Sequence, residues 1–305
     1  MMELLKKFEK GALSHTYQRI DSDYKVDIFL GYNDEGQMSM VITENGRVTP
    51  VKSSKFISVQ LKRREDGKLA LSFDLRDNTY KSMFLIFCKD IIITCEKAGS
   101  EMAISNGLMR WKYWKEMFGK KKTNVLDKSE IKGLIGELLE LRDFFMKKWD
   151  VETAVESWMG PLLGHKDFEI DDTWYEVKSV NENAIQVTIS SLEQLESDVN
   201  GYLVVVRLED TSSVSGCSIN LNDVMISVAE KIFDPDVLEV FRTKLDNVGY
   251  SFDAEYDNYN FLYKGTQRYC VDERFPRLRR SEIVSTIGNV KYTILLDGIT
   301  EFKED

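Results

Sequence analysis

The stretch HKDFEIDDTWYEVKSV, residues 165–180, decides the fold. Its first part, KDFEI, predicts a short strand, and TWYEVKSV predicts a longer one. The residues between them, Asp171 and Asp172, are of a type that favours turns. Because side chains alternate between the two faces of a strand, Glu176 and Lys178 are expected to point the same way.

The acid-x-Lys spacing of Glu176 and Lys178 has little meaning by itself. It recurs at Asp23–Lys25, Asp66–Lys68, Glu130–Lys132 and Glu301–Lys303. The second of these pairs lies in a predicted turn, and the third lies in a predicted helix, where residues two apart do not share a face. The other two lack a preceding acidic strand, whereas Glu176 follows a short strand that carries Asp167, nine residues upstream.

A long amphipathic helix is predicted upstream, over residues 128–149, with Ser129 as its N-cap. Its apolar residues recur at three- and four-residue steps, at Ile131, Leu134, Ile135, Leu138, Leu141 and Phe145. Glu137 lies in this helix close to Gly133 and Gly136, which indicate a close approach of the helix to a sheet. A solvent-facing helix residue is the alternative interpretation of Glu137.

The elements predicted between residues 125 and 210 form an α/β core, and further elements flank it in a chain that is α+β overall. Strands are predicted at 82–95 (SMFLIFCKDIIITC), 151–158 (VETAVESW), 184–190 (AIQVTIS), 201–208 (GYLVVVRL) and 291–299 (KYTILLDGI), and helices at 101–122, 191–197 and 221–248, the last interrupted at Pro235. At roughly 100–200 residues per domain, a chain of 305 residues has room for about two domains. We expect a β-rich N-terminal domain (1–124), a core (125–210) and a mixed, partly helical C-terminal extension that packs on the core (211–305).

The acidic and basic residues of the core fit metal-assisted phosphate chemistry. Two carboxylates, Asp167 and Glu176, and a backbone carbonyl are hard oxygen ligands suited to Mg²⁺. Such a metal ion can polarise a phosphate and activate water, and Lys178 can stabilise developing negative charge. The sequence shows no Ser-His-Asp or Cys-His arrangement, and no glycine-rich phosphate loop follows a strand.

The order of these residues resembles the PD-(D/E)XK nuclease superfamily. GLIGELLEL supplies Glu137, HKDFEI supplies Asp167, and YEVKS supplies Glu176 and Lys178. With the Trp-x-Gly-Pro turn at 158–161, the set is similar to an uncharacterised group of prokaryotic, restriction-like PD-(D/E)XK proteins linked to phage defence. The resemblance covers about residues 125–210 and implies a restriction-endonuclease-like core.

The resemblance also implies roles for individual residues. Asp167, Glu176 and the backbone carbonyl of Val177 would hold Mg²⁺, or Mn²⁺ as its substitute, with Glu137 acting as a ligand through water or at a second metal ion. Lys178 would position the attacking water. Gln194 is the candidate for an accessory polar site. Outside this set, Glu169 is a reserve ligand, and His165 is a loop residue near the site.

A basic stretch just before the core helix is the best candidate for DNA contact. It contains Arg110, Lys112, Lys115, Lys120, Lys121 and Lys122. Such residues can neutralise backbone phosphates, although a solvated face is the alternative. Trp111 and Trp114, interleaved with them, are read as packing residues rather than stacking platforms for bases.

The composition sets limits on function. The net charge of −10 argues against a protein that coats nucleic acid non-specifically, but not against an enzyme with an acidic metal site. Four cysteines without a CxxC pair suit a reducing cytoplasm, and no signal peptide or membrane-spanning stretch is apparent. We expect a cytoplasmic, Mg²⁺-dependent DNA endonuclease of a restriction or phage-defence system, acting as a possible homodimer or with a helicase or methyltransferase. The alternative is a non-catalytic DNA-binding or scaffolding subunit of a multi-protein defence complex.

Overall fold

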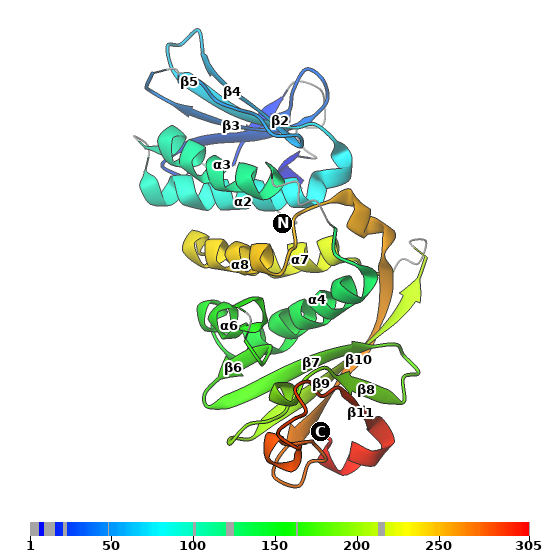
Figure 1. Ribbon diagram of the computed structural model, residues 1–305. Helices are drawn as coiled ribbons and strands as arrows, with labels where there is room; N and C mark the ends of the chain where they lie inside the picture. Colours follow the sequence, from blue (N-terminus) through cyan, green and yellow to red (C-terminus); the bar gives the residue numbers. More distant parts are fainter. Residues whose placement is uncertain are drawn as a thin grey trace. The chain divides into compact units, whose positions relative to one another are not determined.

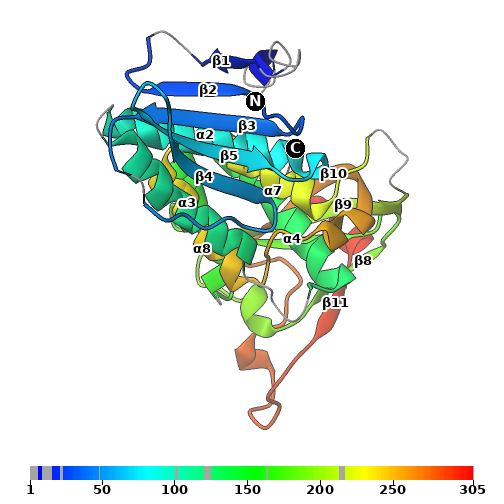
Figure 2. The ribbon, with the colours of Figure 1, turned by 90° about the horizontal axis from the view of Figure 1, so that it is seen from above.

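The chain forms two compact units in a computed structural model (Figures 1 and 2). The first unit comprises residues 1–122 with 232–238, and the second comprises residues 123–231 with 239–305. The structure describes residues 6–8, 16–20, 23–47, 49–99, 102–119, 125–162, 164–212 and 217–304. Helix α8 (Pro235–Asn247) contributes residues to both units.

The first unit is an antiparallel five-stranded sheet covered by two helices. Its strands are β1 (Tyr17–Arg19), β2 (Asp27–Tyr32), β3 (Met38–Glu44), β4 (Ile57–Arg63) and β5 (Leu69–Leu75), in the order β1-β2-β3-β5-β4. After a short turn, η1 (Asn78–Tyr80), come α2 (Lys81–Ala98) and α3 (Ala103–Gly119). They lie along one face of the sheet (Figure 2), where the Phe73 ring of β5 lies 5.1 Å from Phe87 and 5.8 Å from Trp111.

The strand predicted at residues 82–95 is wrong, because this segment lies within helix α2. Residues 83–88 are buried at every position, since the helix is covered by the sheet on one side and by α3 on the other. A helix buried on most sides loses its polar face, and a short apolar run then resembles a buried strand. The predicted helix at 101–122 is confirmed over the described part, α3.

The second unit is built on a four-stranded sheet with the order β10-β9-β7-β6. Its strands are β6 (Phe168–Ile170), β7 (Thr173–Val180), β9 (Gly201–Thr211) and β10 (Asn260–Val271). β6 and β7 form an antiparallel hairpin, β7 runs parallel to β9, and β10 is antiparallel to β9. The hairpin predicted around Asp171 and Asp172 is confirmed, and both residues have positive φ, which aspartate tolerates in tight turns.

Helix α4 (Lys128–Glu140) packs on one face of this sheet and continues into a π-helical turn, η2 (Leu141–Phe145). Gly136 permits the close approach, because a Cβ at this position would lie 2.1 Å from Oγ of Ser179. The N-cap is Asp127 rather than the predicted Ser129. Its side chain accepts from two backbone N–H groups, and Glu130 reciprocates in a capping box.

The opposite face of the sheet is covered by a two-stranded sheet, β8 (Gln186–Ile189) with β11 (Tyr292–Leu295), and by the C-terminal turn η7 (Leu296–Phe302). Trp174, Leu203, Val205 and Phe302 belong to this core. The remaining elements of the second unit are α5 (Met146–Lys148), α6 (Val151–Ser157), η3 (Gly160–Leu162), η4 (Leu192–Gln194), α7 (Leu221–Ala229), η5 (Ala254–Asn258) and η6 (Arg280–Glu282).

The strand predicted at 151–158 is also wrong. It is helix α6, whose N-cap Asp150 accepts a hydrogen bond from the backbone N–H of Thr153. The predicted fold class, an α/β core within an α+β chain, is confirmed. Among the described helices, none combines the length and apolar character needed to cross a membrane.

Candidate active site

Asp167 lies where β6 begins, and one of its carboxylate oxygens is fixed by the neighbouring strand. Its Oδ2 accepts a hydrogen bond from the backbone N–H of Val177 at 2.7 Å, while its own N–H donates to the carbonyl of Tyr175. The N–H and C=O of one strand residue point to the same edge of the strand. The carbonyl of Val177 therefore faces the side on which Asp167 lies.

Glu176 and Lys178 lie on one face of β7, as the alternation of the strand predicts. Nζ of Lys178 lies 2.7 Å from Oε1 of Glu176, and the Glu176 side chain is only 2% exposed. A buried carboxylate is costly unless it is paired or binds a cation. The lysine supplies one positive charge at this position.

Glu137 reaches the same place from helix α4. Its Oε2 accepts a hydrogen bond from the indole Nε1 of Trp158 at 2.8 Å. Gly160 brings Glu137 and Asp167 together, because a Cβ there would lie 3.0 Å from Oε2 of Glu137 and 3.2 Å from Oδ1 of Asp167. Two carboxylate oxygens from distant parts of the chain thus border one small space.

The three acids disfavour each other's ionisation. Burial and the charge of Asp167 raise the pKa of Glu176 to about 8, against the opposing effect of Lys178. Burial and the same carboxylate raise the pKa of Glu137, and burial raises that of Asp167, which Lys178 lowers in part. Burial therefore disfavours the charged forms of these acids, and a bound cation would favour their ionisation.

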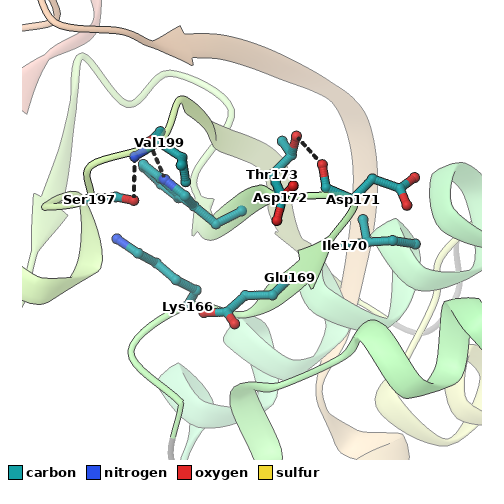
Figure 3. A pocket seen from close by; sticks show the side chains of 9 residues that line it. Lys166, Glu169, Ile170, Asp171, Asp172, Thr173, Ser197 and Val199 are labelled. Atoms are coloured by element: carbon teal, nitrogen blue, oxygen red, sulfur yellow. Dashed lines mark hydrogen bonds between the residues drawn. The ribbon is translucent and has the colours of Figure 1, made fainter.

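An open pocket of about 440 Å³ lies beside the β6–β7 hairpin (Figure 3). Lys166, Glu169 and Asp172 are among its lining residues. Nζ of Lys166 donates to the carbonyls of Glu193 and Glu196, and burial lowers the pKa of Lys166 to about 8. The lysine that precedes Asp167 therefore fastens the η4 turn to the site strand.

The other predicted residues lie around the site in different settings. Glu169, Asp172 and His165 are exposed, as is Asp171, whose Oδ2 accepts from the indole of Trp149 at 2.9 Å. Gln194 uses its side-chain oxygen locally, to accept a hydrogen bond from the backbone N–H of Ser190 at 2.7 Å. The structure gives this side chain a role in its own turn.

The residues of the basic stretch in the first unit differ in how far they are exposed to solvent. Arg110 is 6% exposed and forms two hydrogen bonds with Asp90, so its guanidinium is directed into the protein, contrary to the predicted DNA contact. Lys112 is exposed and Lys115 is half-buried. Lys120, Lys121 and Lys122 lie outside the described residues. Trp111 and Trp114 pack against Phe87, as predicted.

A metal ion remains the group that this donor set suits best. In the described ranges, no three His, Cys, Asp or Glu side chains stand close enough together to hold an ion by themselves. Glu137 and Asp167, whose carboxylate oxygens approach each other at Gly160, nevertheless supply the hard oxygen donors that Mg²⁺ and Mn²⁺ use. Magnesium commonly keeps several water ligands and takes only one or two carboxylates.

The sequence places Trp158 and Gly160 in the Trp-x-Gly-Pro turn but indicates no role for either residue. Their roles depend on the residues after α6 lying against Glu137 of α4, a tertiary contact that the sequence alone does not reveal. The sequence does not single out Lys244, whose Nζ donates to the carbonyl of Trp158. In the sequence it is only one lysine within an amphipathic helix.

Comparison with known proteins agrees with this geometry. Residues 6–297 match a family described as "Putative PD-(D/E)XK family member, (DUF4420)". Neither a curated protein nor a solved structure matches the chain. Because the match covers nearly the whole sequence, the chain belongs to this PD-(D/E)XK family.

Proposed function

We propose that the protein is a metal-dependent endonuclease that hydrolyses phosphodiester bonds of DNA. The single observation that supports this most strongly is the convergence at Gly160. Oε2 of Glu137 and Oδ1 of Asp167 border one space there, and Asp167 is itself bonded to the strand that carries Glu176 and Lys178. Membership of a PD-(D/E)XK family supports a nuclease-like assignment.

In this proposal Mg²⁺ or Mn²⁺ is held by Asp167, Glu176 and the carbonyl of Val177. Glu137 acts as a ligand through water or at a second metal ion. When bound, the ion supplies Lewis-acid stabilisation of the phosphate and a lowered pKa for an attacking water. Lys178 orients that water and stabilises negative charge that develops on the phosphate. Asp167 keeps its orientation because its second oxygen is held by the N–H of Val177.

The wider biological setting is part of the same proposal and rests on the resemblance to restriction-like proteins. We place the enzyme in a prokaryotic restriction or phage-defence system. DNA is its substrate, and a helicase or methyltransferase, or a second copy of the chain, is a candidate partner. A partner that unwinds or delivers DNA would also add affinity for DNA, which the net charge of −10 does not favour.

The test is cleavage of supercoiled plasmid DNA by purified protein with Mg²⁺ or Mn²⁺. Asp167→Ala and Lys178→Ala should abolish nicking and linearisation. The matched controls Asp198→Ala and Lys147→Ala, at exposed positions, should retain both. Cleavage at the wild-type rate by Lys178→Ala protein with a native circular dichroism spectrum would rule the assignment out.

One observation favours a second candidate, a non-catalytic DNA-binding or scaffolding subunit. Within the part of the chain that the structure describes, no group of three ligating side chains is formed. Calorimetric titration with Mn²⁺ separates the two candidates. Binding that disappears in Glu176→Ala supports the enzyme, whereas wild-type protein that binds DNA but no metal supports the subunit.

A further inference from the structure

Trp158 is the link between Glu137 and the rest of the second unit. Its side chain is fully buried, and its only polar atom, Nε1, donates to Oε2 of Glu137 at 2.8 Å. The ring of Phe241 on α8 lies 5.9 Å from its own ring. The orientation of the Glu137 carboxylate therefore depends on where the backbone at residue 158 is held.

Lys244 holds that backbone. It lies on α8 and is 5% exposed, and its Nζ donates to three carbonyls, those of Val155 at 2.9 Å, Glu156 at 2.8 Å and Trp158 at 2.6 Å. An ammonium group has three N–H donors, so all of them are matched. These carbonyls belong to the end of α6 and the residue after it, where a positive charge is favourable. The carbonyl of Val155 also accepts from the backbone N–H of Trp158, at 3.4 Å.

The same turn is bonded to the second acid. The backbone N–H groups of Met159 and Gly160 both donate to the carbonyl oxygen of Asp167, at 2.8 Å and 3.1 Å. The turn at 158–160 thus contacts Glu137 through the indole of Trp158 and Asp167 through two backbone N–H groups. Its contact with Lys244 is through the carbonyl of Trp158. Its position fixes how far apart the two carboxylates lie.

We propose that Lys244 is a positioning residue for the metal site, which sets the orientation of the Glu137 carboxylate through Trp158. The proposal rests on the proposed function, because it treats Glu137 as a carboxylate that serves the metal ion. A lysine is an expensive choice for a packing position, since burying an ammonium group costs free energy that only polar partners recover. Burial indeed lowers the pKa of Lys244 to about 8. An apolar side chain at this position would leave the three carbonyls without the donor that Lys244 supplies.

The first test reads the indole N–H of Trp158 directly and needs neither metal nor DNA. The chain has five tryptophans, so a ¹H–¹⁵N spectrum of labelled protein shows five indole resonances, and Trp158→Phe identifies the relevant one. Glu137→Ala should move this resonance because the acceptor is lost. Lys244→Met should move the same resonance and leave the other four in place, and Lys231→Met, an exposed control, should move none.

The second test measures Mn²⁺ affinity by calorimetry in a double-mutant cycle. Lys244→Met should weaken binding about 10-fold or more, which is typical for partners of metal ligands. In a Glu137→Ala background the same change should have no further effect, because the carboxylate that Trp158 would orient is absent. A merely structural role would weaken both backgrounds equally, and that result would overturn the proposal.

Lys244→Gln covers the case in which Lys244→Met does not fold. Glutamine retains two N–H donors, so it should fold, shift the Trp158 resonance in the same direction and weaken binding to a smaller degree. An unmoved resonance together with unchanged affinity in this variant rejects the positioning role. Wild-type protein that binds no Mn²⁺ would instead reject the proposed function, while the resonance test would still report on Lys244.

Discussion

Oδ2 of Asp167 accepts a hydrogen bond from the backbone N–H of Val177, while Oδ1 of the same carboxylate borders the space at Gly160. The two oxygens of Asp167 thus have different tasks. One fixes the side chain to the strand that carries Glu176 and Lys178, and the other remains available to a cation. This division explains how a half-buried acid at the start of a three-residue strand can have a defined orientation.

The first prediction separates these two tasks. Asp167→Asn keeps an oxygen that can accept from the Val177 N–H but removes the negative charge. We expect the fold to be retained and Mn²⁺ affinity to fall at least about 10-fold, because charge is what the cation requires. Calorimetric titration and a denaturation curve measure the two effects. Wild-type affinity in Asp167→Asn would show that this carboxylate does not serve a metal ion.

The second prediction concerns stability against pH without metal. Because the folded state raises the pKa of Glu176 to about 8 from an ordinary 4.5, it binds a proton over the intervening pH range that the unfolded chain releases. The free energy of unfolding therefore falls as pH rises from about 5 to about 8, by up to about 1.4 kcal/mol per pH unit from this group. Lys166 and Lys244, with pKa values lowered to about 8, add stability only above that range.

Urea denaturation at several pH values between about 5 and 8, in the presence of a chelator, measures this slope. Glu176→Gln should have a flatter profile, since its amide cannot titrate. Adding Mn²⁺ to the wild type should restore stability mainly at the high-pH end. Parallel profiles for the wild type and Glu176→Gln would contradict the burial of an acid with a raised pKa.

The sequence predicts the helix and the strand that carry the candidate site better than it predicts the elements around them. The Glu-Val-Lys strand and the helix that carries Glu137 follow local periodicity, and both were predicted from it. The segments at 82–95 and 151–158 are helices although the sequence predicts strands. Phe84 lies in an apolar run whose helical character depends on being buried on several sides. In the second segment Val151, Thr153 and Val155 are β-branched residues at every second position, as in a strand. Local pattern cannot report burial by elements distant in the sequence.

Residues that act through tertiary contacts were likewise beyond the sequence. Arg110 was predicted to bind DNA because it stands in a basic run, but its partner Asp90 lies on another helix, twenty residues away. Lys244 donates to carbonyls almost ninety positions earlier in the chain. Charge patterns reveal that a residue is basic, but not whether its charge is used inside the fold.

The third prediction uses two glycines of the second unit. Gly160→Ala places a methyl group 3.0 Å from Oε2 of Glu137 and 3.2 Å from Oδ1 of Asp167, so these carboxylates must shift by a few tenths of an ångström. We expect Mn²⁺ affinity and DNA cleavage to fall about 10-fold or more. Gly133→Ala is the control, since its Cβ would meet nothing within 4 Å. It should leave affinity unchanged and stabilise helix α4 by up to about 1 kcal/mol. Equal affinity in the two variants would contradict the convergence at Gly160.

The last prediction distinguishes two basic residues that lie two positions apart on α3. Arg110 is buried against Asp90 and also donates to the carbonyl of Pro235 at 2.8 Å, whereas Lys112 is exposed. Arg110→Ala leaves the Asp90 carboxylate buried without this partner and should lower the free energy of unfolding by about 3–5 kcal/mol. Lys112→Ala should change it by less than about 0.5 kcal/mol. Chemical denaturation measures both values.

The same pair tests whether α3 contacts DNA. Lys112→Ala should weaken DNA binding and reduce the dependence of affinity on salt by about one phosphate contact, because an exposed lysine can neutralise one phosphate. Arg110→Lys, which keeps the charge inside the fold, should leave the salt dependence unchanged. The measurement is fluorescence anisotropy with a labelled duplex at several salt concentrations. Identical salt dependence in Lys112→Ala and the wild type would place the DNA elsewhere, and a stable Arg110→Ala protein would contradict the buried ion pair.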